Sequence, residues 1–400
     1  MEHSVKPTAG TRAGAQGQTP DQGAHGDAPP IPMFNLTRQY AEIRPAVEAA
    51  VLKLLANTQY IGGGEVEQFE AQLGAFSDCR AVAMSNGTDA ILGGLMALGI
   101  RPGDEVITTP FTFFATGGCI RRLGAKPVFV DIDPRTFLID LNAIAAALTP
   151  AVKCIIPVHL FGQMVSMKHL TAMACHHGIT VFEDAAQCIG ACDQDGIRPA
   201  ELGAAAALSF YPTKNLGAAG DAGALLTRSE TLAQRFRQTR QHGETSRYMH
   251  EFVGGNFRLD AIQCAILRIK LPFLQQWNQR RRDIADFYDR AFAGTDAVAP
   301  HRIRGAHHVF HQYVLRAARR DALKDHLTGL GIGSMVYYPR PLHLQECFAE
   351  LGYQAGSLPH AEQACREVLA LPIFPELTEA ELRRIANAVR SFFGARSLSE

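Results

Sequence analysis

A lysine and an aspartate that follow two predicted strands are the residues of this chain best suited to chemistry. Asp184 follows the apolar stretch Thr180–Glu183, and Lys214 follows the apolar stretch Ala206–Tyr211. A lysine with a lowered pKa can form a Schiff base, and a carboxylate can hold a ring nitrogen protonated. Each residue alone also has an ordinary explanation, because a loop lysine is usually a solvated charge and an aspartate can cap the next helix.

Two further segments offer groups that bind an anion. Ser85–Asp89 reads Ser-Asn-Gly-Thr-Asp and lies between an apolar run and a helical pattern, where a helix N-terminus favours negative charge. Ser209 precedes Lys214 and can offer a hydroxyl group. The turn alone is weak evidence, since any tight strand-to-helix turn uses such residues. The combination of turn, carboxylate, hydroxyl and lysine at strand ends of one sheet predicts a site for pyridoxal phosphate.

The elements that must position these groups alternate between strand and helix. Apolar runs predict strands at Ala81–Met84, Glu105–Thr109, Pro127–Ile132, Cys154–His159, Thr180–Glu183, Ala206–Tyr211 and Gly223–Thr227. Amphipathic spacing predicts helices at Asp89–Leu98, Phe113–Leu123, Leu141–Leu148, Met167–His177 and Leu232–His242. This alternation predicts an α/β domain whose mostly parallel, mixed sheet is flanked by helices.

Both ends of the chain differ from this pattern. Residues 1–30 are rich in Gly, Pro, Gln, Ala and Thr and predict a disordered tail. We expect helical structure at Ile43–Leu55, a flexible break at residues 62–64, and a helix over Asp260–Trp277 bent at Pro272. The predicted elements of a small C-terminal α+β domain are a helix at Arg280–Phe292, a strand with Val309–Leu315, a helix from Asp321, a strand at Ser334–Tyr338 and two final helices. The predicted domains are therefore 31–279, which binds the cofactor, and 280–400.

Composition excludes several classes of protein. The 400 residues include 39 Lys+Arg and 39 Asp+Glu, so a nucleic-acid partner or an anionic membrane surface is not expected. The chain has no long apolar run for a membrane span and no secretory signal. Its nine cysteines form no CxxC pair, which favours buried thiols in the cytoplasm over disulfides or a metal site. The histidines at 307–311 are likewise not expected to bind a metal.

Eight stretches carry a more specific pattern: Ser85–Ala90, Pro102–Ile107, Pro110–Phe113, Asp131–Asp133, Glu183–Gln187, Ser209–Gly223, Asn256–Gln263 and Tyr338–His343. With these stretches the chain resembles the sugar-nucleotide aminotransferases of the DegT/StrS family, from about Ile31 to Phe393. These are fold-type I pyridoxal phosphate enzymes, similar in fold to aspartate aminotransferase. The resemblance implies that fold, with a large cofactor-binding domain and a smaller C-terminal domain.

The resemblance implies a role for each residue around the cofactor ring. Lys214 forms the Schiff base with the cofactor and shuttles the proton, and Asp184 pairs with the pyridine nitrogen. Gln187 contacts the ring hydroxyl oxygen, and Phe113 stacks on the ring face.

The resemblance also implies how the phosphate is held and how many subunits take part. Gly87, Thr88 and Ser209 would hold the phosphate within one subunit. Asn256 would reach it from the other subunit, so a homodimer with shared active sites is expected. The expected substrate-binding residues are Arg247, Tyr248, His250, Tyr338 and His343.

The implied reaction is an amino transfer to a nucleotide-linked keto sugar. A 3-keto hexose on UDP or dTDP is the expected acceptor and L-glutamate the expected donor. Three alternatives stay open at this point. One is a pyridoxal phosphate sugar dehydratase, although family members of that kind carry His at the position of Lys214. The others are a cyclitol aminotransferase and a non-catalytic regulatory paralogue, which the complete set of cofactor residues argues against.

Overall fold

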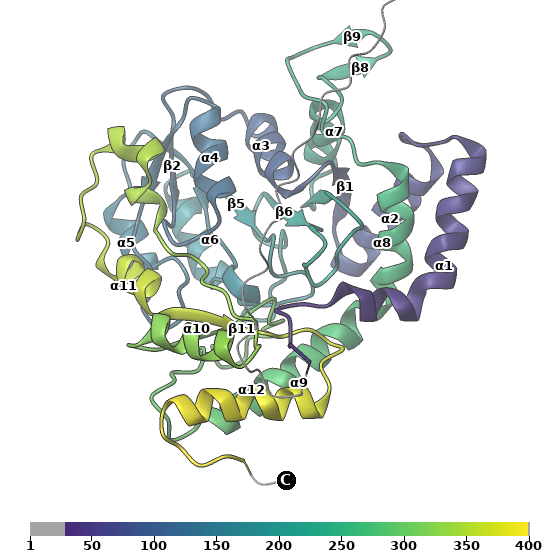
Figure 1. Cartoon of the computed structure of the whole chain (residues 1–400). Coiled ribbons are helices and arrows are strands. Elements are labelled where there is room, and N and C mark those ends of the chain that lie inside the picture. The colour runs from purple at the N-terminus through teal and green to yellow at the C-terminus, as the bar shows by residue number, and fades with distance from the viewer. Residues whose placement is uncertain (1–28, 399–400) are drawn as a thin grey trace, which may run out of the picture.

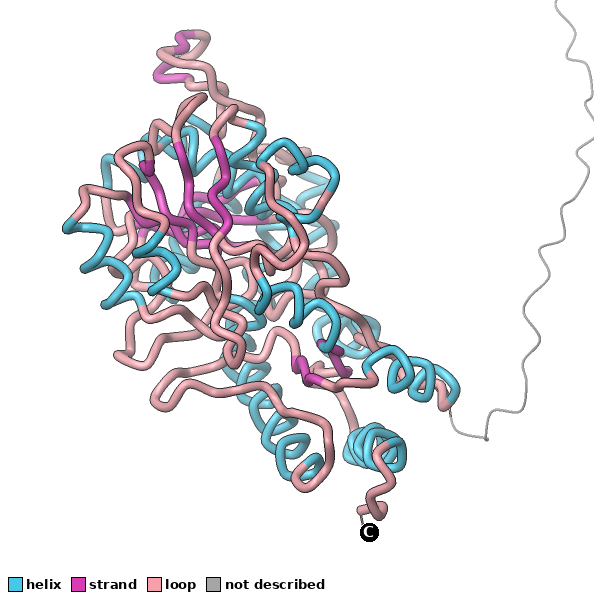
Figure 2. The backbone as a smooth tube through the Cα atoms, turned by 90° about the vertical axis from the view of Figure 1, so that its left-hand side faces the viewer, coloured by secondary structure: helices cyan, strands magenta, loops and turns pink. Residues whose placement is uncertain are grey.

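A seven-stranded sheet forms the centre of the molecule, with helices on both faces (Figures 1 and 2). The computed structural model describes residues 29–398, so most of the predicted tail lies outside the described residues. The strand order is β1-β7-β6-β5-β4-β2-β3, and β7 alone runs antiparallel to its neighbours. The strands are β1 (Arg80–Met84), β2 (Glu105–Thr108), β3 (Lys126–Phe129), β4 (Val152–Ile156), β5 (Thr180–Asp184), β6 (Ala205–Ser209) and β7 (Gly223–Thr227). Each overlaps a predicted strand, so the predicted sheet is confirmed.

Alternating side chains of each strand enter two separate cores. In β1, Ala81 and Ala83 face one core, whereas Val82 and Met84 face the other. Because both faces are covered, the strands are mainly apolar and read as nearly continuous apolar runs in the sequence. This double burial explains why apolar runs located the strands, and why their ends, where polar residues begin, were predicted to within a few residues.

The helices divide between the two faces of the sheet. One core contains side chains of α3 (Gly87–Ala97), α4 (Phe114–Arg122) and α7 (Glu230–Thr239). The other contains side chains of α2 (Gly64–Ser77), α5 (Leu141–Ala146), α6 (Met167–His176) and α8 (Ala261–Lys270), and α1 (Leu36–Asn57) packs on α8. The predicted break at residues 62–64 is wrong in part, because Gly63 takes the N-cap position with φ 75° and α2 starts directly after it.

The helix predicted over Asp260–Trp277 is two helices. Helix α8 ends at Lys270, a 3₁₀ turn η2 (Leu271–Phe273) follows, and α9 runs through Leu274–Phe292. Pro272 lacks the N–H that an uninterrupted helix needs, so the interruption falls where the bend was predicted. Helix α9 also includes the helix expected to begin at Arg280. The proposed boundary between residues 279 and 280 thus lies inside α9, and the division into two domains stays a prediction.

The C-terminal part packs around its own core. It contains β10 (Tyr313–Arg316), α10 (Arg320–Gly329), α11 (Pro359–Glu367), β11 (Val368–Leu371) and α12 (Glu379–Phe392), with β10 and β11 paired antiparallel. Short 3₁₀ turns lie at η3 (Leu342–Leu344) and η4 (Glu346–Leu351). The strand predicted at Ser334–Tyr338 is wrong, since Met335 makes only an isolated bridge to Ala370. Pro339 and Pro341 follow it, and proline cannot donate to a strand ladder.

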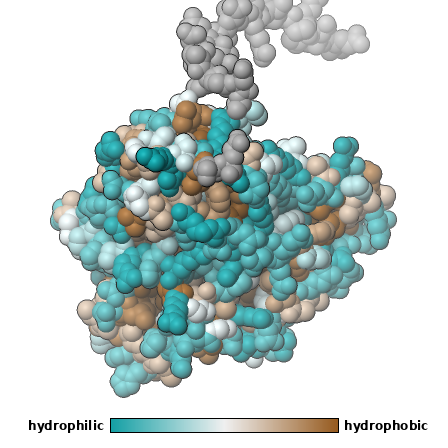
Figure 3. Space-filling view, turned by 90° about the horizontal axis from the view of Figure 1, so that it is seen from below, coloured by the Kyte–Doolittle hydropathy of each residue, from teal (hydrophilic) through white to brown (hydrophobic). Residues whose placement is uncertain are grey.

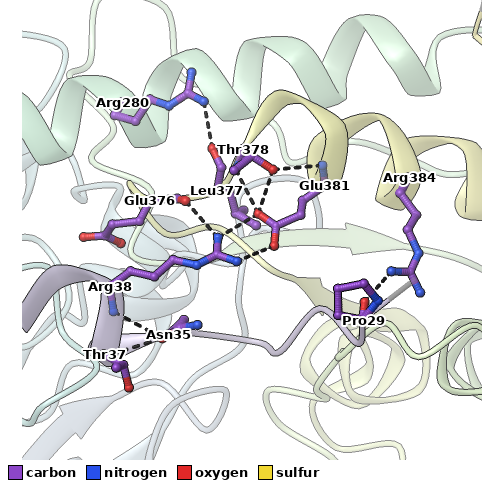
Figure 4. Close-up of polar contacts among 10 residues, drawn as sticks. All are labelled: Pro29, Asn35, Thr37, Arg38, Arg280, Glu376, Leu377, Thr378, Glu381 and Arg384. Carbon is purple, nitrogen blue, oxygen red and sulfur yellow. Dashed lines mark hydrogen bonds and ion pairs between the residues drawn. The ribbon is translucent and has the colours of Figure 1, made fainter. Parts of the chain in front are cut away.

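The first described residues attach α1 to the C-terminal part (Figure 4). Arg38 donates to both carboxylate oxygens of Glu381, at 2.8 and 2.6 Å, and Arg384 donates to the carbonyl oxygen of Pro29. The Arg38 guanidinium lowers the pKa of Glu381 to about 2. Ile31 forms a bridge with Ile332 and is buried. Pro29, which falls inside the predicted tail, thus already makes contacts with the C-terminal part.

The surface seen from below the view of Figure 1 is mainly hydrophilic, with apolar side chains in separate patches (Figure 3). Among residues 29–398, no helix combines the length and the apolar character needed to cross a bilayer.

Candidate active site

The ends of several strands meet at one edge of the sheet. The parallel strands β1, β5 and β6 end there, at Met84, Asp184 and Ser209. Because β7 runs in the opposite direction, its first residue, Gly223, pairs with Ser209. This edge is where open α/β sheets bind ligands, and it brings together the segments predicted to hold the cofactor.

The turn after β1 packs against the end of β6. A Cβ atom on Gly87 would lie 2.6 Å from the Cβ atom of Ser209, so only glycine fits at this position. Asn86 caps α3 by accepting the Asp89 N–H at 2.8 Å. The first N–H groups of a helix have no partner within the helix. The turn at Gly87 and Thr88 and the Ser209 hydroxyl therefore bring together N–H and O–H donors that could hold an anion, and this group of three residues is called the anion cradle.

The Asp184 carboxylate is buried and oriented by two donors. Its side chain is 5% exposed, the Thr116 hydroxyl donates to Oδ2 at 2.6 Å, and the Ala186 N–H donates to Oδ1 at 3.2 Å. Thr116 belongs to α4 on the neighbouring part of the sheet edge. The sequence analysis missed Thr116, because one threonine within an apolar helix gives no signal of its own.

Lys214 lies in the turn that leaves β6, and its side chain is partly buried. Burial lowers the pKa of Lys214 to about 8, while the charge of Asp184 acts in the opposite direction. The effect of burial is the larger, so roughly a tenth of this amine is unprotonated at pH 7, far more than for a lysine with the ordinary pKa of 10.5. A neutral amine is the form that attacks a carbonyl carbon.

The residue after Lys214 is fixed by three neighbours. The Asn215 amide donates to Asn278 Oδ1 at 2.7 Å and to the carbonyl oxygen of Val309 at 3.0 Å. His311 Nδ1 lies 3.2 Å from Asn215 Oδ1, and its pKa is well below the ordinary value because the ring is buried. The backbone that carries Lys214 is therefore held from α9 and from the segment before β10.

Aromatic and amide groups line the site beside Asp184. Gln187 accepts the Phe161 N–H at 2.6 Å and donates to the Tyr338 hydroxyl at 3.2 Å. Phe113 is 58% exposed, and its ring centroid lies 6.5 Å from that of Tyr338. An exposed ring face of this kind fits stacking on a planar cofactor.

A fully buried His–Glu pair supports the end of β5. His159 Nε2 lies 2.8 Å from Glu183 Oε2, and His159 Nδ1 accepts the Val165 N–H at 3.2 Å. Since Nδ1 accepts, Nε2 carries the proton donated to Glu183. The backbone N–H of His159 also donates to the backbone carbonyl oxygen of Asp184 at 3.0 Å. The position of Glu183 directly before Asp184 was the only available sequence signal for this pair.

Three of the predicted substrate residues lie away from this edge. Arg247, Tyr248 and His250 belong to an exposed hairpin of β8 (Glu244–Ser246) and β9 (Met249–His250), which projects from the body of the subunit (Figure 1). An open groove there is lined by Gln241, His242, Glu244, Arg247, Tyr248, His250 and Arg258. The structure does not bring these residues to Lys214 of the same chain. Arg258 was not predicted as a site residue; its Nε atom is buried and has no hydrogen-bond partner among residues 29–398.

The remaining two predicted substrate residues, Tyr338 and His343, lie in different surroundings. Tyr338 contacts Gln187 and thus lies with the cofactor residues. His343 is 1% exposed, with Nε2 3.2 Å from Glu362 and its ring against Tyr353, so it is packed in a separate buried cluster. Its role in substrate binding stays a prediction.

Asn256 lies between the hairpin and the anion cradle. It forms a bridge with Gln241, and its neighbour Phe257 accepts the Ser85 N–H at 2.8 Å. The Asn256 side chain is exposed. Whether it reaches a partner's cofactor stays a prediction.

The described residues fit pyridoxal phosphate. The cofactor needs an amine for its aldehyde carbon, a carboxylate for its pyridine nitrogen and a cradle for its phosphate. Three features supply these groups: the Lys214 amine with its lowered pKa, the oriented carboxylate of Asp184, and the close contact of Gly87 with Ser209, which leaves no room for a Cβ atom on residue 87.

Comparison with known sequences gives a consistent result. The chain matches the model of the DegT/DnrJ/EryC1/StrS aminotransferase family over residues 41–390. It is 47% identical to a pleiotropic regulatory protein of Geobacillus stearothermophilus, over 91% of this chain and 98% of that protein. It is also 41% identical to a UDP-N-acetyl-3-dehydro-alpha-D-glucosamine 3-aminotransferase of Acidithiobacillus ferrooxidans, over 90% of this chain and 97% of that protein.

Comparison with solved structures gives the same fold. DesV of Streptomyces venezuelae, solved in complex with a ketimine intermediate, superposes with a TM-score of 0.89 at 39% identity, covering 91% of this chain and 99% of that chain. NtdA of Bacillus subtilis, with bound cofactor PMP, superposes with a TM-score of 0.86 at 32% identity, covering 92% and 86%. PMP is the aminated form of the cofactor that the present geometry accommodates.

Proposed function

The chain belongs to the DegT/DnrJ/EryC1/StrS aminotransferase family, and from this premise we propose that it transfers an amino group from L-glutamate to a nucleotide-linked 3-keto hexose. Its cofactor is pyridoxal phosphate. The observation that carries the reaction type is the Lys214 amine, whose pKa is lowered to about 8, at the same sheet edge as the oriented Asp184 carboxylate. The acceptor class is supported by the name of the Acidithiobacillus relative.

Lys214 is the group of this chain that moves the proton. When bound, pyridoxal phosphate supplies an electrophilic carbon and an electron sink. The lowered pKa of Lys214, about 8, lets its amine both accept and return a proton near neutral pH. The Asp184 carboxylate is held in one orientation, because the Thr116 hydroxyl and the Ala186 N–H donate to its two oxygens. Its negative charge favours a protonated ring nitrogen.

The other residues of the sheet edge bind and orient. The cradle of Gly87, Thr88 and Ser209 would hold the phosphate through N–H and O–H donors. Gln187, fixed by the Phe161 N–H, would offer its amide to the ring hydroxyl oxygen. Phe113 would stack on one ring face and exclude water from it.

The active unit in this proposal is a homodimer with shared sites. The hairpin residues Arg247, Tyr248 and His250 are exposed and lie away from their own Lys214, so they are free to complete a partner's site. Arg247 and Arg258 of the same groove suit a diphosphate, because guanidinium groups bind phosphate oxygens in pairs. Asn256, between the groove and the cradle, would donate to the partner's cofactor phosphate.

A regulatory role without catalysis is the second candidate, because a 47% identical relative bears the name pleiotropic regulatory protein. The complete set of Asp184, Gln187, Ser209 and Lys214 argues for an enzyme. The lysine at position 214 argues for amino transfer, because the dehydratases of this family carry His at that position. We further propose a cytoplasmic location, which agrees with all nine cysteines being free.

A reverse-reaction screen tests the proposal. The protein is incubated with 2-oxoglutarate and a panel of amino sugars on UDP, dTDP or no nucleotide, together with amino cyclitols, and products are read by mass spectrometry. We expect conversion of a nucleotide-linked 3-amino sugar to the keto sugar, with formation of glutamate. Conversion of only a free sugar or cyclitol would replace the proposed acceptor, and no conversion with a fully loaded protein would favour the regulatory role.

A further inference from the structure

Helix α8 holds the loop that carries Lys214 at two points. Gln263 accepts the Ala219 N–H at 2.9 Å, and Lys270 Nζ donates to the carbonyl oxygen of Gly217 at 2.7 Å. Lys270 is the last residue of α8, just before the interruption at Pro272. The loop after β6 is therefore connected to a helix that contributes no group to the cofactor cradle.

Lys270 is an unusual residue for this position. Its side chain is 9% exposed, and among residues 29–398 it forms no ion pair with a carboxylate. Burial lowers its pKa to about 8, with Glu376 acting weakly in the other direction. Burying an amine in this way costs free energy, which an apolar side chain of similar length would avoid. Among residues 29–398, the bond to Gly217 is the one hydrogen bond of its amine that offsets this cost, together with the attraction of Glu376.

The carbonyl group that Lys270 holds is tightly coupled to the Lys214 turn. A Cβ atom on Gly217 would lie 2.2 Å from the carbonyl oxygen of Pro212, so the two backbone segments are in direct contact. The Ala218 N–H donates to the Phe210 carbonyl oxygen at 2.8 Å, which closes the loop at its base. A movement of Gly217 must therefore displace the segment before Lys214.

We propose that Lys270 is a positioning residue for Lys214: its hydrogen bond to Gly217 keeps the turn closed and thereby keeps the Lys214 amine in surroundings poor in water. The proposal rests on Lys214 being the cofactor lysine. A neutral Lys270 amine still donates, so the bond persists when Lys270 loses its proton.

The Lys214 amine reports on whether this turn is closed. The titratable groups that face it are Asp184 from β5, Cys188 from the loop after β5, and His311 from the segment before β10. Burial keeps Cys188 a neutral thiol and His311 a neutral imidazole, so Asp184 is the one charged neighbour. If the turn opens, water reaches Lys214 and its pKa rises from about 8 towards the ordinary lysine value of 10.5.

The test measures how fast cofactor-free protein captures pyridoxal phosphate, followed as the Schiff-base absorbance band across a range of pH. Because the unprotonated amine reacts, a pKa higher by one unit slows capture about tenfold at pH 7. We expect slower capture and a pH profile shifted to higher pH in two variants. Lys270→Met has no donor, and the amide of Lys270→Gln is too short to reach Gly217. Lys270→Arg, which keeps a donor, and Lys324→Met, at an exposed lysine, should follow the wild-type profile.

Thermal unfolding of each variant identifies those that fold, and Lys270→Gln decides the test if Lys270→Met does not fold. An unshifted profile in a folded Met or Gln variant overturns the proposal, as does an equal shift in Lys270→Arg. Lys214→Ala separates the two assignments. If Lys214→Ala still forms the Schiff-base band, Lys214 is not the cofactor lysine, and the proposal for Lys270 falls with it. The proposed function is then tested separately by the reverse-reaction screen.

Discussion

The sheet edge and the β8–β9 hairpin hold two halves of the predicted site, and they are built in opposite ways. At the edge, Asp184 is 5% exposed and has two donors from different elements. On the hairpin, Tyr248 is 75% exposed. The cofactor groups are thus fixed by the core of their own subunit, whereas the hairpin groups have few contacts within it.

This difference separates chemistry from recognition. A group that holds a proton or a charge at a defined point needs buried partners to fix it. A group that selects among substrates can lie on an exposed segment that becomes ordered against a partner subunit or a ligand. In the proposed dimer, the buried cofactor groups thus come from one subunit, whereas the exposed Asn256 and the hairpin residues would act from its partner.

The largest expected effect is at Lys214. Lys214→Ala removes the amine that moves the proton, so we expect turnover to fall by about 10²- to 10⁴-fold or more. The measurement is steady-state turnover, with the exposed Lys153→Ala as the matched control. Turnover close to wild type would contradict the role of Lys214 as the group that moves the proton.

Asp184→Asn keeps the shape of the side chain and removes the charge that holds the ring nitrogen protonated. We expect turnover to fall by about 10²-fold with little change in the unfolding temperature. Both quantities are measured on the loaded protein. A full-rate Asn variant would mean that the carboxylate charge has no part in the reaction.

Thr116→Val removes the donor to Asp184 Oδ2. A hydrogen bond to a charged group contributes about 1.5–3 kcal/mol, so we expect cofactor retention or turnover to weaken about tenfold to a hundredfold. Thr112→Val is the matched control, because Thr112 is equally buried and contacts Thr116 but not Asp184. Equal effects of the two variants would count against a specific role for the Thr116 hydroxyl.

The smallest effect is expected on the hairpin. Arg247→Ala removes one exposed charge, so we expect KM for the sugar substrate to rise roughly fivefold, as for a loss of about 1 kcal/mol. The reaction with L-glutamate alone should not change. Arg101→Ala, at an exposed arginine outside the hairpin, is the control. An equal effect on both substrates would show that the hairpin does not act in sugar recognition.

Sequence patterns predicted the sheet edge well because burial on both faces makes its strands continuous apolar runs. Asp184 follows directly where one run ends, and Ser209 and Lys214 lie at and after the end of another. The supporting contacts of Thr116 and His159 could not be predicted in this way, since they join segments that are distant in sequence. Their partners become evident only when the strand order is known.

The hairpin left no such signal. Its strands are short, polar and exposed, so apolar alternation, which marks a strand in sequence, is missing at residues 244–250. Arg247, Tyr248 and His250 were found through a family resemblance alone. Ser334–Tyr338 shows the opposite error, because its strand-forming residues gave a signal where the structure has only an isolated bridge from Met335 to Ala370.

The most direct test of the shared site mixes two variants, Lys214→Ala and Asn256→Asp, under conditions that exchange subunits. If Asn256 acts on the partner's cofactor, each mixed dimer contains one site with both lesions and one intact site. Since about half of the dimers in an equal mixture are mixed, we predict recovery of roughly a quarter of wild-type activity. No recovery in a mixture shown to have exchanged subunits, or an active monomer in sedimentation, would contradict the shared site.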